Sequence, residues 1–174
     1  RLNRYGVSYC IARNYQNHPN YRGDLDLFVC KEDVSRVGKI VMQLCKEYEG
    51  VLLLQSYQFS TLVTDTQKIF VFYILDINNG KLYQLDLFMG FSLWGVCVLD
   101  SKNIIKNRIW DKYGFFRMAP NQELLIKYFQ LRSYNALAIR KKVNQYKSQL
   151  GALLLENKID LNKDYIIELQ KFHL

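Results

Sequence analysis

Two carboxylates, Asp24 and Asp26, lie two residues apart at the start of an apolar run that continues to Val29. Alternate side chains of a β-strand share one face, so both carboxylates are expected on the same side, with their Cα atoms about 7 Å apart. A third carboxylate, Asp86, interrupts a second strand-like run. Like charges held side by side repel, and a pair of Mg²⁺ ions relieves this because hard cations bind carboxylate and phosphate oxygens. Asp24, Asp26 and Asp86 are therefore the predicted ligands of a two-metal site.

Other interpretations of the same stretch compete with a metal site. An Asp-x-Asp pair at the end of a strand also occurs where no metal binds. The tripeptide Arg22-Gly23-Asp24 matches an adhesion motif, but it runs directly into a predicted buried strand rather than an exposed loop tip. Arg22 is either a phosphate contact or a solvated side chain, and Gly23 allows close approach of the backbone. The aspartate pair alone therefore leaves more than one interpretation open.

The elements that would position these carboxylates are predicted strands, because they are rich in β-branched and aromatic residues or alternate in polarity. They are Tyr5–Ala12, Leu25–Cys30, Val51–Gln58, Ile69–Ile77, Lys81–Met89, Leu93–Leu99 and Gly114–Met118. Asn78-Asn79-Gly80 is a strong hairpin signal. In the strand after it, Asp86 shares the less apolar face with Gln84. This placement suits a side chain of a functional site.

One helix is predicted after the aspartate pair, with Glu32-Asp33 as its cap and Gly50 as its end. Its apolar positions recur every three or four residues. They are Val34, Val37, Ile40, Val41, Leu44, Cys45 and Tyr48.

From Pro120 the pattern changes from strand-like to helical. Pro120 suits the first turn of a helix that runs to about Leu131. A second helix is predicted over about Asn135–Glu156, with a break near Gly151, and a third from about Leu161. We therefore predict an α+β fold, with a mixed sheet flanked by helices in residues 1–119 and a helical segment in residues 120–174.

The composition narrows the class of protein. With 174 residues, 49% of them hydrophobic, the chain suits one compact domain with a helical appendage. No apolar run reaches the roughly 18–20 residues of a membrane span. The four cysteines are far apart and there are two histidines, which argues against zinc and suits reduced thiols in the cytoplasm. The net charge of +8 suits an anionic partner such as a nucleotide, a nucleic acid or a phosphorylated glycan.

The chain begins at Arg1 rather than at a methionine. We therefore expect that an upstream piece, such as a neighbouring domain, has been removed.

The order of these features resembles the nucleotidyltransferase superfamily of the DNA polymerase beta type. The shared features are a strand, a polar loop, Gly-Asp-Leu-Asp-Leu at residues 23–27, a helix and a later lone aspartate in a strand. More narrowly, Tyr-Cys-Ile-Ala-Arg-Asn-Tyr at residues 9–15, followed by Asp-Leu-Asp-Leu-Phe-Val, is similar to nucleotidyltransferase-like proteins encoded among bacterial surface-polysaccharide genes. Segments 85–87, 93–95 and 115–120 are similar to the same group, so the resemblance covers roughly residues 5–130.

The resemblance implies a role for each aspartate. Asp24 and Asp26 would bind two Mg²⁺ ions and, through them, the triphosphate of a nucleoside triphosphate. Asp86 would hold the second metal, lower the pKa of the acceptor hydroxyl and serve as a candidate to take its proton. Two cations about 4 Å apart stabilise the entering and leaving oxygens of an in-line attack on phosphorus.

One position departs from the superfamily pattern. A Gly-Ser pair usually precedes the aspartates at the start of a helix and holds phosphate, whereas this chain has Arg13-Asn14 there. Arg13 can offer a guanidinium fork to a phosphate, and Asn14 can donate a hydrogen bond. The departure equally fits a fold that binds its ligand without transferring a group.

The implied activity is Mg²⁺-dependent transfer of a nucleotidyl or phosphoryl group from a nucleoside triphosphate to a hydroxyl. The acceptor would be a sugar, a glycan precursor or a nucleic acid. Two alternatives stay open: an RNA- or protein-modifying nucleotidyltransferase of toxin–antitoxin type, and a non-catalytic interaction domain of a larger protein. The basic stretch Arg140–Lys142 with Lys147 is either an acceptor contact or a solvated surface.

Overall fold

The computed structural model describes residues 1–12, 15, 24–59, 68–93, 96–136 and 140–157. The chain divides into two compact units, Arg1–Ala119 and Pro120–Leu174. The described part is a mixed α+β fold with a multistranded mixed sheet and four α-helices.

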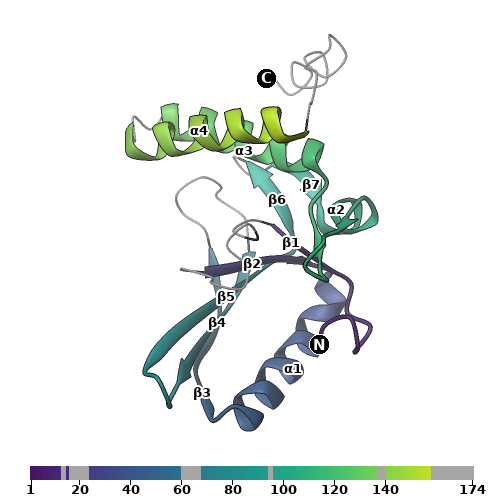
Figure 1. The fold of residues 1–174 in the computed structure, drawn as a ribbon, viewed down its shortest axis with the longest axis vertical. Helices are drawn as coiled ribbons and strands as arrows, with labels where there is room; N and C mark the ends of the chain where they lie inside the picture. The colour runs from purple at the N-terminus through teal and green to yellow at the C-terminus, as the bar shows by residue number, and fades with distance from the viewer. Residues whose placement is uncertain (13–14, 16–23, 60–67, 94–95, 137–139, 158–174) are drawn as a thin grey trace. The chain divides into compact units, whose positions relative to one another are not determined.

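Seven strands of the first unit form one sheet, in the order β3-β4-β5-β2-β1-β9-β8. Figure 1 labels β1 to β5 of this sheet. Their bounds are β1 Tyr9–Ile11, β2 Asp24–Val29, β3 Gly50–Phe59, β4 Lys68–Asp76, β5 Lys81–Phe88, β8 Ile109–Trp110 and β9 Phe116–Arg117. β2 is central: it pairs in parallel with β5 and antiparallel with β1. The predicted strands over 51–58, 69–77 and 81–89 are confirmed to within one residue at every end.

The hairpin predicted at Asn78-Asn79-Gly80 is also confirmed. β4 and β5 pair antiparallel from Asp76 opposite Lys81 onward. The carboxylate of Asp76 accepts hydrogen bonds from the backbone N–H groups of Asn78 and Asn79, at 3.0 and 3.3 Å. Gly80 has φ +64°, which favours glycine. The turn therefore forms from local hydrogen bonds that the sequence itself specifies.

The main core lies between one face of this sheet and α1, Val34–Glu47 (Figure 1). The predicted apolar positions of α1 are buried at Val34, Val37, Ile40, Val41 and Cys45. Strand alternation sends Leu27 and Val29 of β2 and Leu87 of β5 into the same core. The intervening residues of β2 and β5 therefore face the opposite side of the sheet, and they include the three aspartates.

The ends of α1 differ from the prediction. A short 3-10 helix, Lys31–Asp33, precedes it, and the side chain of Asp33 makes no cap hydrogen bond. The Asp33 carboxylate instead accepts from the backbone N–H of Ser8 at 3.3 Å and pairs with Arg36 at 2.9 Å. The helix ends at Glu47 rather than at Gly50, and Tyr48 is 65% exposed rather than part of the apolar face.

The first strand was predicted too long, because it begins at Tyr9 rather than Tyr5. The residues before it form turns. In these turns Gly6 has φ +65°, and its backbone N–H donates to the carbonyl oxygen of Asn3 at 3.2 Å.

The region around residues 90–118 also differs from the prediction. The strand predicted over Leu93–Leu99 is two strands, β6 Gly90–Leu93 and β7 Val96–Asp100, which pair as a separate two-stranded sheet. A short helix follows, α2 Ser101–Lys106, whose N-cap Asp100 accepts from the N–H of Asn103 at 2.8 Å. The strand predicted over Gly114–Met118 shrinks to β9, and β8 was not predicted.

The second unit consists of α3, Pro120–Ala136, and α4, Arg140–Asn157, within the described residues. The predicted break at Gly151 is wrong, because α4 continues through it. The ammonium of Lys127 lies 3.4 Å from the Glu123 carboxylate and donates to Gln149 of α4 at 3.2 Å, so it joins the two helices. The third helix, predicted from Leu161, lies outside the described residues.

Within the described part, none of the helices combines the length and the apolar composition that a membrane-crossing segment needs.

Candidate metal centre

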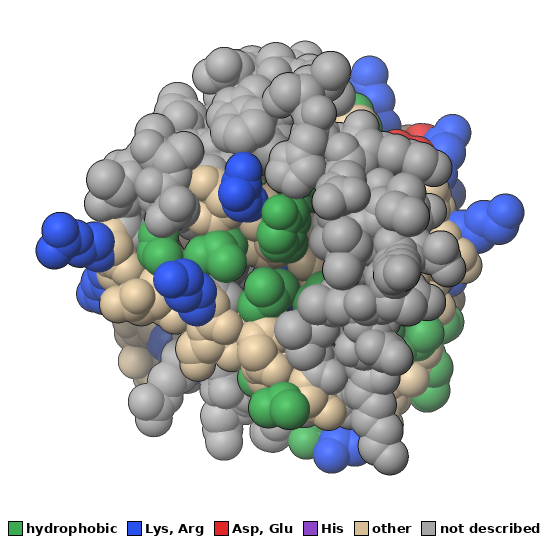
Figure 2. Space-filling model, turned by 90° about the horizontal axis from the view of Figure 1, so that it is seen from above, with side chains coloured by type: hydrophobic (Ala, Val, Ile, Leu, Met, Phe, Trp, Pro, Cys, Tyr) green, Lys and Arg blue, Asp and Glu red, His purple; other side chains and the backbone are tan. Residues whose placement is uncertain are grey.

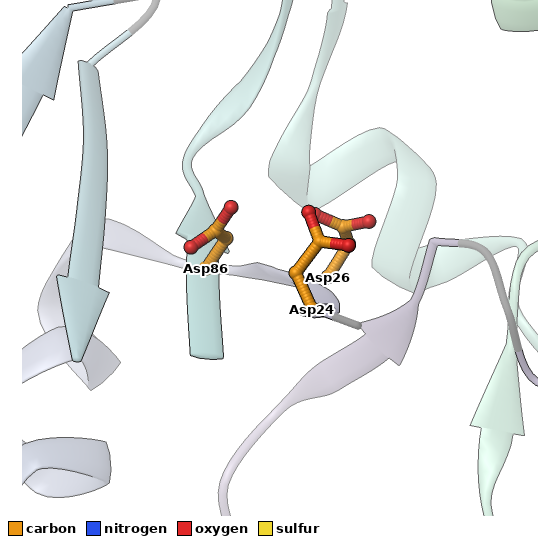
Figure 3. Close-up of side chains that lie close together, drawn as sticks. All are labelled: Asp24, Asp26 and Asp86. Carbon is orange, nitrogen blue, oxygen red and sulfur yellow. The ribbon is translucent and has the colours of Figure 1, made fainter. Parts of the chain in front are cut away.

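The parallel pairing of β2 with β5 brings the three aspartates together. In its register, Asp26 lies opposite Asp86, and Asp24 lies opposite Gln84. Each of the three offers a carboxylate oxygen, and these atoms all lie within 4.8 Å of one another. Figure 3 shows the carboxylates of Asp24 and Asp26 rising side by side from β2, with that of Asp86 beside them from β5. The predicted cluster therefore forms, although Asp86 lies 60 residues after Asp26 in the chain.

The burial of the cluster makes its charge costly. Asp26 is 0% exposed, Asp86 is 7% exposed and Asp24 is half-buried. Removing carboxylates from water costs several kcal/mol per ion unless compensating charge lies near. The donor set consists of carboxylate oxygens, which Mg²⁺, Ca²⁺ and Mn²⁺ prefer over softer metals. The three residues could thus bind a divalent metal ion, and their chemistry fits a hard one.

Gln84 joins the site as a neighbour of Asp86. Its Nε2 donates to both oxygens of the Asp86 carboxylate, at 2.9 and 3.1 Å. Both residues lie in β5, two positions apart and therefore on the same face. An amide carries no charge, so this contact orients the carboxylate without neutralising it. Sequence reasoning placed Gln84 on this face but assigned it no function; the signal was its position two residues before Asp86.

Apolar side chains border the carboxylates on the same face of the sheet. Val71 of β4, which lies opposite Asp86, is 1% exposed. Two residues beyond the Asp26–Asp86 pair, Phe28 and Phe88 lie opposite each other with ring centroids 5.7 Å apart. α2 contacts both β1 and β2. Buried apolar side chains beside the carboxylates lower the local dielectric constant and so strengthen electrostatic interactions there.

The chain directly after β1 holds the backbone of Asp26 by a hydrogen bond. The backbone N–H of Ala12, directly after β1, donates to the carbonyl oxygen of Asp26 at 2.9 Å. The next residues, Arg13 and Asn14, are the predicted phosphate contacts. They lie outside the described residues, as do Arg22 and Gly23, so these four assignments stay predictions.

Comparison with models of protein families, with curated proteins and with solved structures finds no match for this chain.

Proposed function

We propose that this chain is a Mg²⁺-dependent nucleotidyltransferase of the DNA polymerase beta type. It moves a nucleotidyl or phosphoryl group from a nucleoside triphosphate to a hydroxyl, with a sugar, glycan precursor or nucleic acid as acceptor. One observation carries the proposal: three carboxylates, two of them buried, have oxygens within 4.8 Å of one another on neighbouring strands. The sequence resemblance adds the order of the motifs.

The proposed division of labour among the three carboxylates is the one that the sequence resemblance implies. Asp24, the most accessible of the three, and Asp26 would hold the metals to which the triphosphate binds. Asp86, oriented by Gln84, would hold the second metal and is the candidate to accept the proton of the acceptor hydroxyl. In nucleotidyl transfer, the hydroxyl oxygen bonds to the α-phosphorus while the bond to the bridging oxygen breaks and pyrophosphate leaves. Metal ions at the carboxylates would supply stabilisation of the negative charge on these oxygens.

The charge of the chain supports an anionic ligand. The sequence has 24 Lys and Arg residues against 16 Asp and Glu residues. In Figure 2, blue Lys and Arg side chains project at several points of the face seen from above, and red carboxylates appear at one edge. A surplus of basic charge raises the local concentration of triphosphates and other anions.

Isothermal titration of the wild type with each nucleoside triphosphate, with and without Mg²⁺, tests the proposal. We expect Mg²⁺-dependent binding of at least one triphosphate and its loss in Asp26→Asn, because the metal loses a charged ligand. Glu32→Gln is the matched control: it removes one carboxylate from an exposed pair with Lys102 at 3.8 Å. Such surface pairs contribute little stability, so this variant should bind as the wild type does.

A transfer assay then separates the chemical alternatives. Label moved from the α-phosphate to a hydroxyl acceptor indicates nucleotidyl transfer, and label moved from the γ-phosphate indicates phosphoryl transfer. Binding without either transfer favours the non-catalytic domain, in keeping with Arg13-Asn14 at the Gly-Ser position. A wild type that binds no triphosphate at any Mg²⁺ concentration, or an Asp26→Asn variant that binds equally well, contradicts the metal–nucleotide site.

A further inference from the structure

A compact hairpin forms the end of the seven-stranded sheet farthest from β3. This edge hairpin, Arg108–Arg117, contains β8 and β9, and β8 is the last strand of the sheet order. Asp111 holds its turn: its N–H donates to the carbonyl of Phe115 at 2.8 Å, and its carboxylate accepts from the N–H of Tyr113 at 3.1 Å. Gly114 has φ +84°, which favours glycine. Local hydrogen bonds and the conformation of Gly114 thus define the turn of the hairpin.

The edge hairpin presents large aromatic rings to solvent. Trp110 is 57% exposed and Tyr113 is 43% exposed. Each ring rests on a phenylalanine: Trp110 meets Phe116 edge to face at 4.7 Å, and Tyr113 stacks on Phe115 at 6.2 Å. Aromatic rings held in place this way offer contact area at little cost in conformational entropy. The rings are thus both accessible and oriented.

Cationic side chains accompany these rings. The guanidinium of Arg108 lies 4.1 Å from the ring centre of Phe116, and the ammonium of Lys112 lies 4.9 Å from that of Tyr113. The hairpin contains one carboxylate, Asp111, and it pairs with Arg117 at 2.9 Å. Among the described residues, no carboxylate forms an ion pair with Arg108 or Lys112. The hairpin therefore combines exposed aromatic rings with two cations that pair with no carboxylate of the described residues.

We propose that the edge hairpin binds single-stranded nucleic acid. Proteins that bind single strands combine cations, which track the phosphates, with aromatic rings, on which bases stack. The hairpin offers both within ten residues of chain, Arg108–Arg117. β8 is three strands from β2 in the sheet order, or roughly 14 Å at the usual strand spacing. The inference goes beyond the proposed transferase activity and does not depend on it.

Fluorescence anisotropy of labelled oligouridylate tests this surface. We expect Trp110→Ala to weaken binding by about tenfold, because each base stacked on an aromatic ring contributes about 1–3 kcal/mol. Lys112→Ala should lower the slope of log K against log salt by about 0.7, the value for one phosphate contact on a single strand. Trp110→Phe, which keeps a ring, should restore most of the affinity.

Tyr83→Ala is the matched control. Tyr83 is 38% exposed and has the ammonium of Lys81 4.9 Å from its ring centre, but it lies in β5 rather than in the hairpin. We expect this variant to bind oligouridylate as the wild type does. A second measurement covers the case in which Trp110→Ala fails to fold. In Trp94→Phe, Trp110 is the only tryptophan, and oligouridylate should quench its fluorescence.

Three results would overturn the inference. One is an unchanged affinity in a folded Trp110→Ala variant. Another is an equal loss in Tyr83→Ala, which would make the binding a property of the whole basic surface. The third is a pair of findings: heparin binds as tightly as oligouridylate, and oligouridylate does not quench Trp110. This result would identify a surface for acidic glycans instead.

Discussion

The burial of Asp26 gives the acidic cluster its significance. Its side chain is fully enclosed, yet it shares a space of a few ångströms with two further carboxylates. An exposed acidic group is common and carries little information, whereas three carboxylates gathered partly out of water need compensating positive charge. A divalent metal supplies that charge with the oxygen ligands the site offers.

Gln84 is expected to tune this metal site. Replacing Gln84 with Leu removes both hydrogen bonds to Asp86, so the carboxylate should spend less time in the metal-binding orientation. Loss of such an orienting partner typically lowers metal affinity 10–100-fold. We expect an effect of about tenfold on Mn²⁺ affinity, measured by calorimetry without nucleotide.

Gln43→Leu is the matched control for this measurement. Gln43 also donates its amide to a carboxylate, that of Glu47 at 3.0 Å, but on the exposed side of α1. Its replacement should leave Mn²⁺ affinity unchanged. If the Gln84 and Gln43 variants both bind Mn²⁺ like the wild type, Gln84 has no orienting role, while the metal site itself would stand.

At the scale of elements, the sequence predicts best where periodicity is long. Alternation in the run 24–29 correctly separates Leu27 and Val29 from the aspartates, and the three-and-four spacing correctly identifies the buried face of α1. β8 and β9, with two residues each, are too short for any periodicity to show. The parallel pairing of β2 with β5 is also invisible in the sequence, because α1, β3 and β4 lie between these two strands in the chain.

Alanine substitutions at two glycines test how closely these elements pack. A Cβ added at Gly38 of α1 would lie 3.5 Å from the ring of Phe72, an ordinary contact. Alanine also loses less conformational entropy than glycine when a helix forms. Gly38→Ala should therefore raise the free energy of unfolding by about 0.5–1 kcal/mol, measured by urea denaturation.

Gly90→Ala should have the opposite effect. Gly90 begins β6 with φ +154°, and a Cβ there would lie 3.0 Å from the carbonyl oxygen of Leu99 on β7. Backbone strain of this kind costs of order 1–3 kcal/mol. A Gly90→Ala variant as stable as the wild type would contradict the described packing of β6 against β7. A Gly38→Ala variant less stable than the wild type would contradict the described packing of α1 against Phe72.

At the scale of the whole molecule, the α+β class follows from a change of pattern along the chain. Strand-like runs give way to helical spacing at Pro120, where the second compact unit begins. The composition indicates how large a core the chain can form and that its net charge is positive. It does not reveal which strands are neighbours in the sheet. The candidate site was predictable as three aspartates in a suitable order, but the pairing of β2 with β5 that brings them together was not.

The reactivity of the four cysteine thiols tests whether the core of the first unit is packed as described. Cys10, Cys30 and Cys45 are buried, and Cys97 is exposed. Loss of hydration raises the pKa of the Cys30 and Cys45 thiols, so a smaller fraction is reactive thiolate at neutral pH. An aromatic disulfide reagent should therefore label Cys97 rapidly in the native protein and all four cysteines in denaturant. Rapid labelling of Cys10 or Cys45 in the native state would show that the core is not packed as described.

The most direct test of the metal site is anomalous diffraction from crystals grown with Mn²⁺ and a non-hydrolysable nucleoside triphosphate analogue. We expect anomalous peaks within coordination distance of oxygens from Asp24, Asp26 and Asp86, with the triphosphate bound to the same ions. A map without a peak at the three carboxylates at saturating Mn²⁺, or one in which Asp86 turns away from the ion, would contradict the two-metal site.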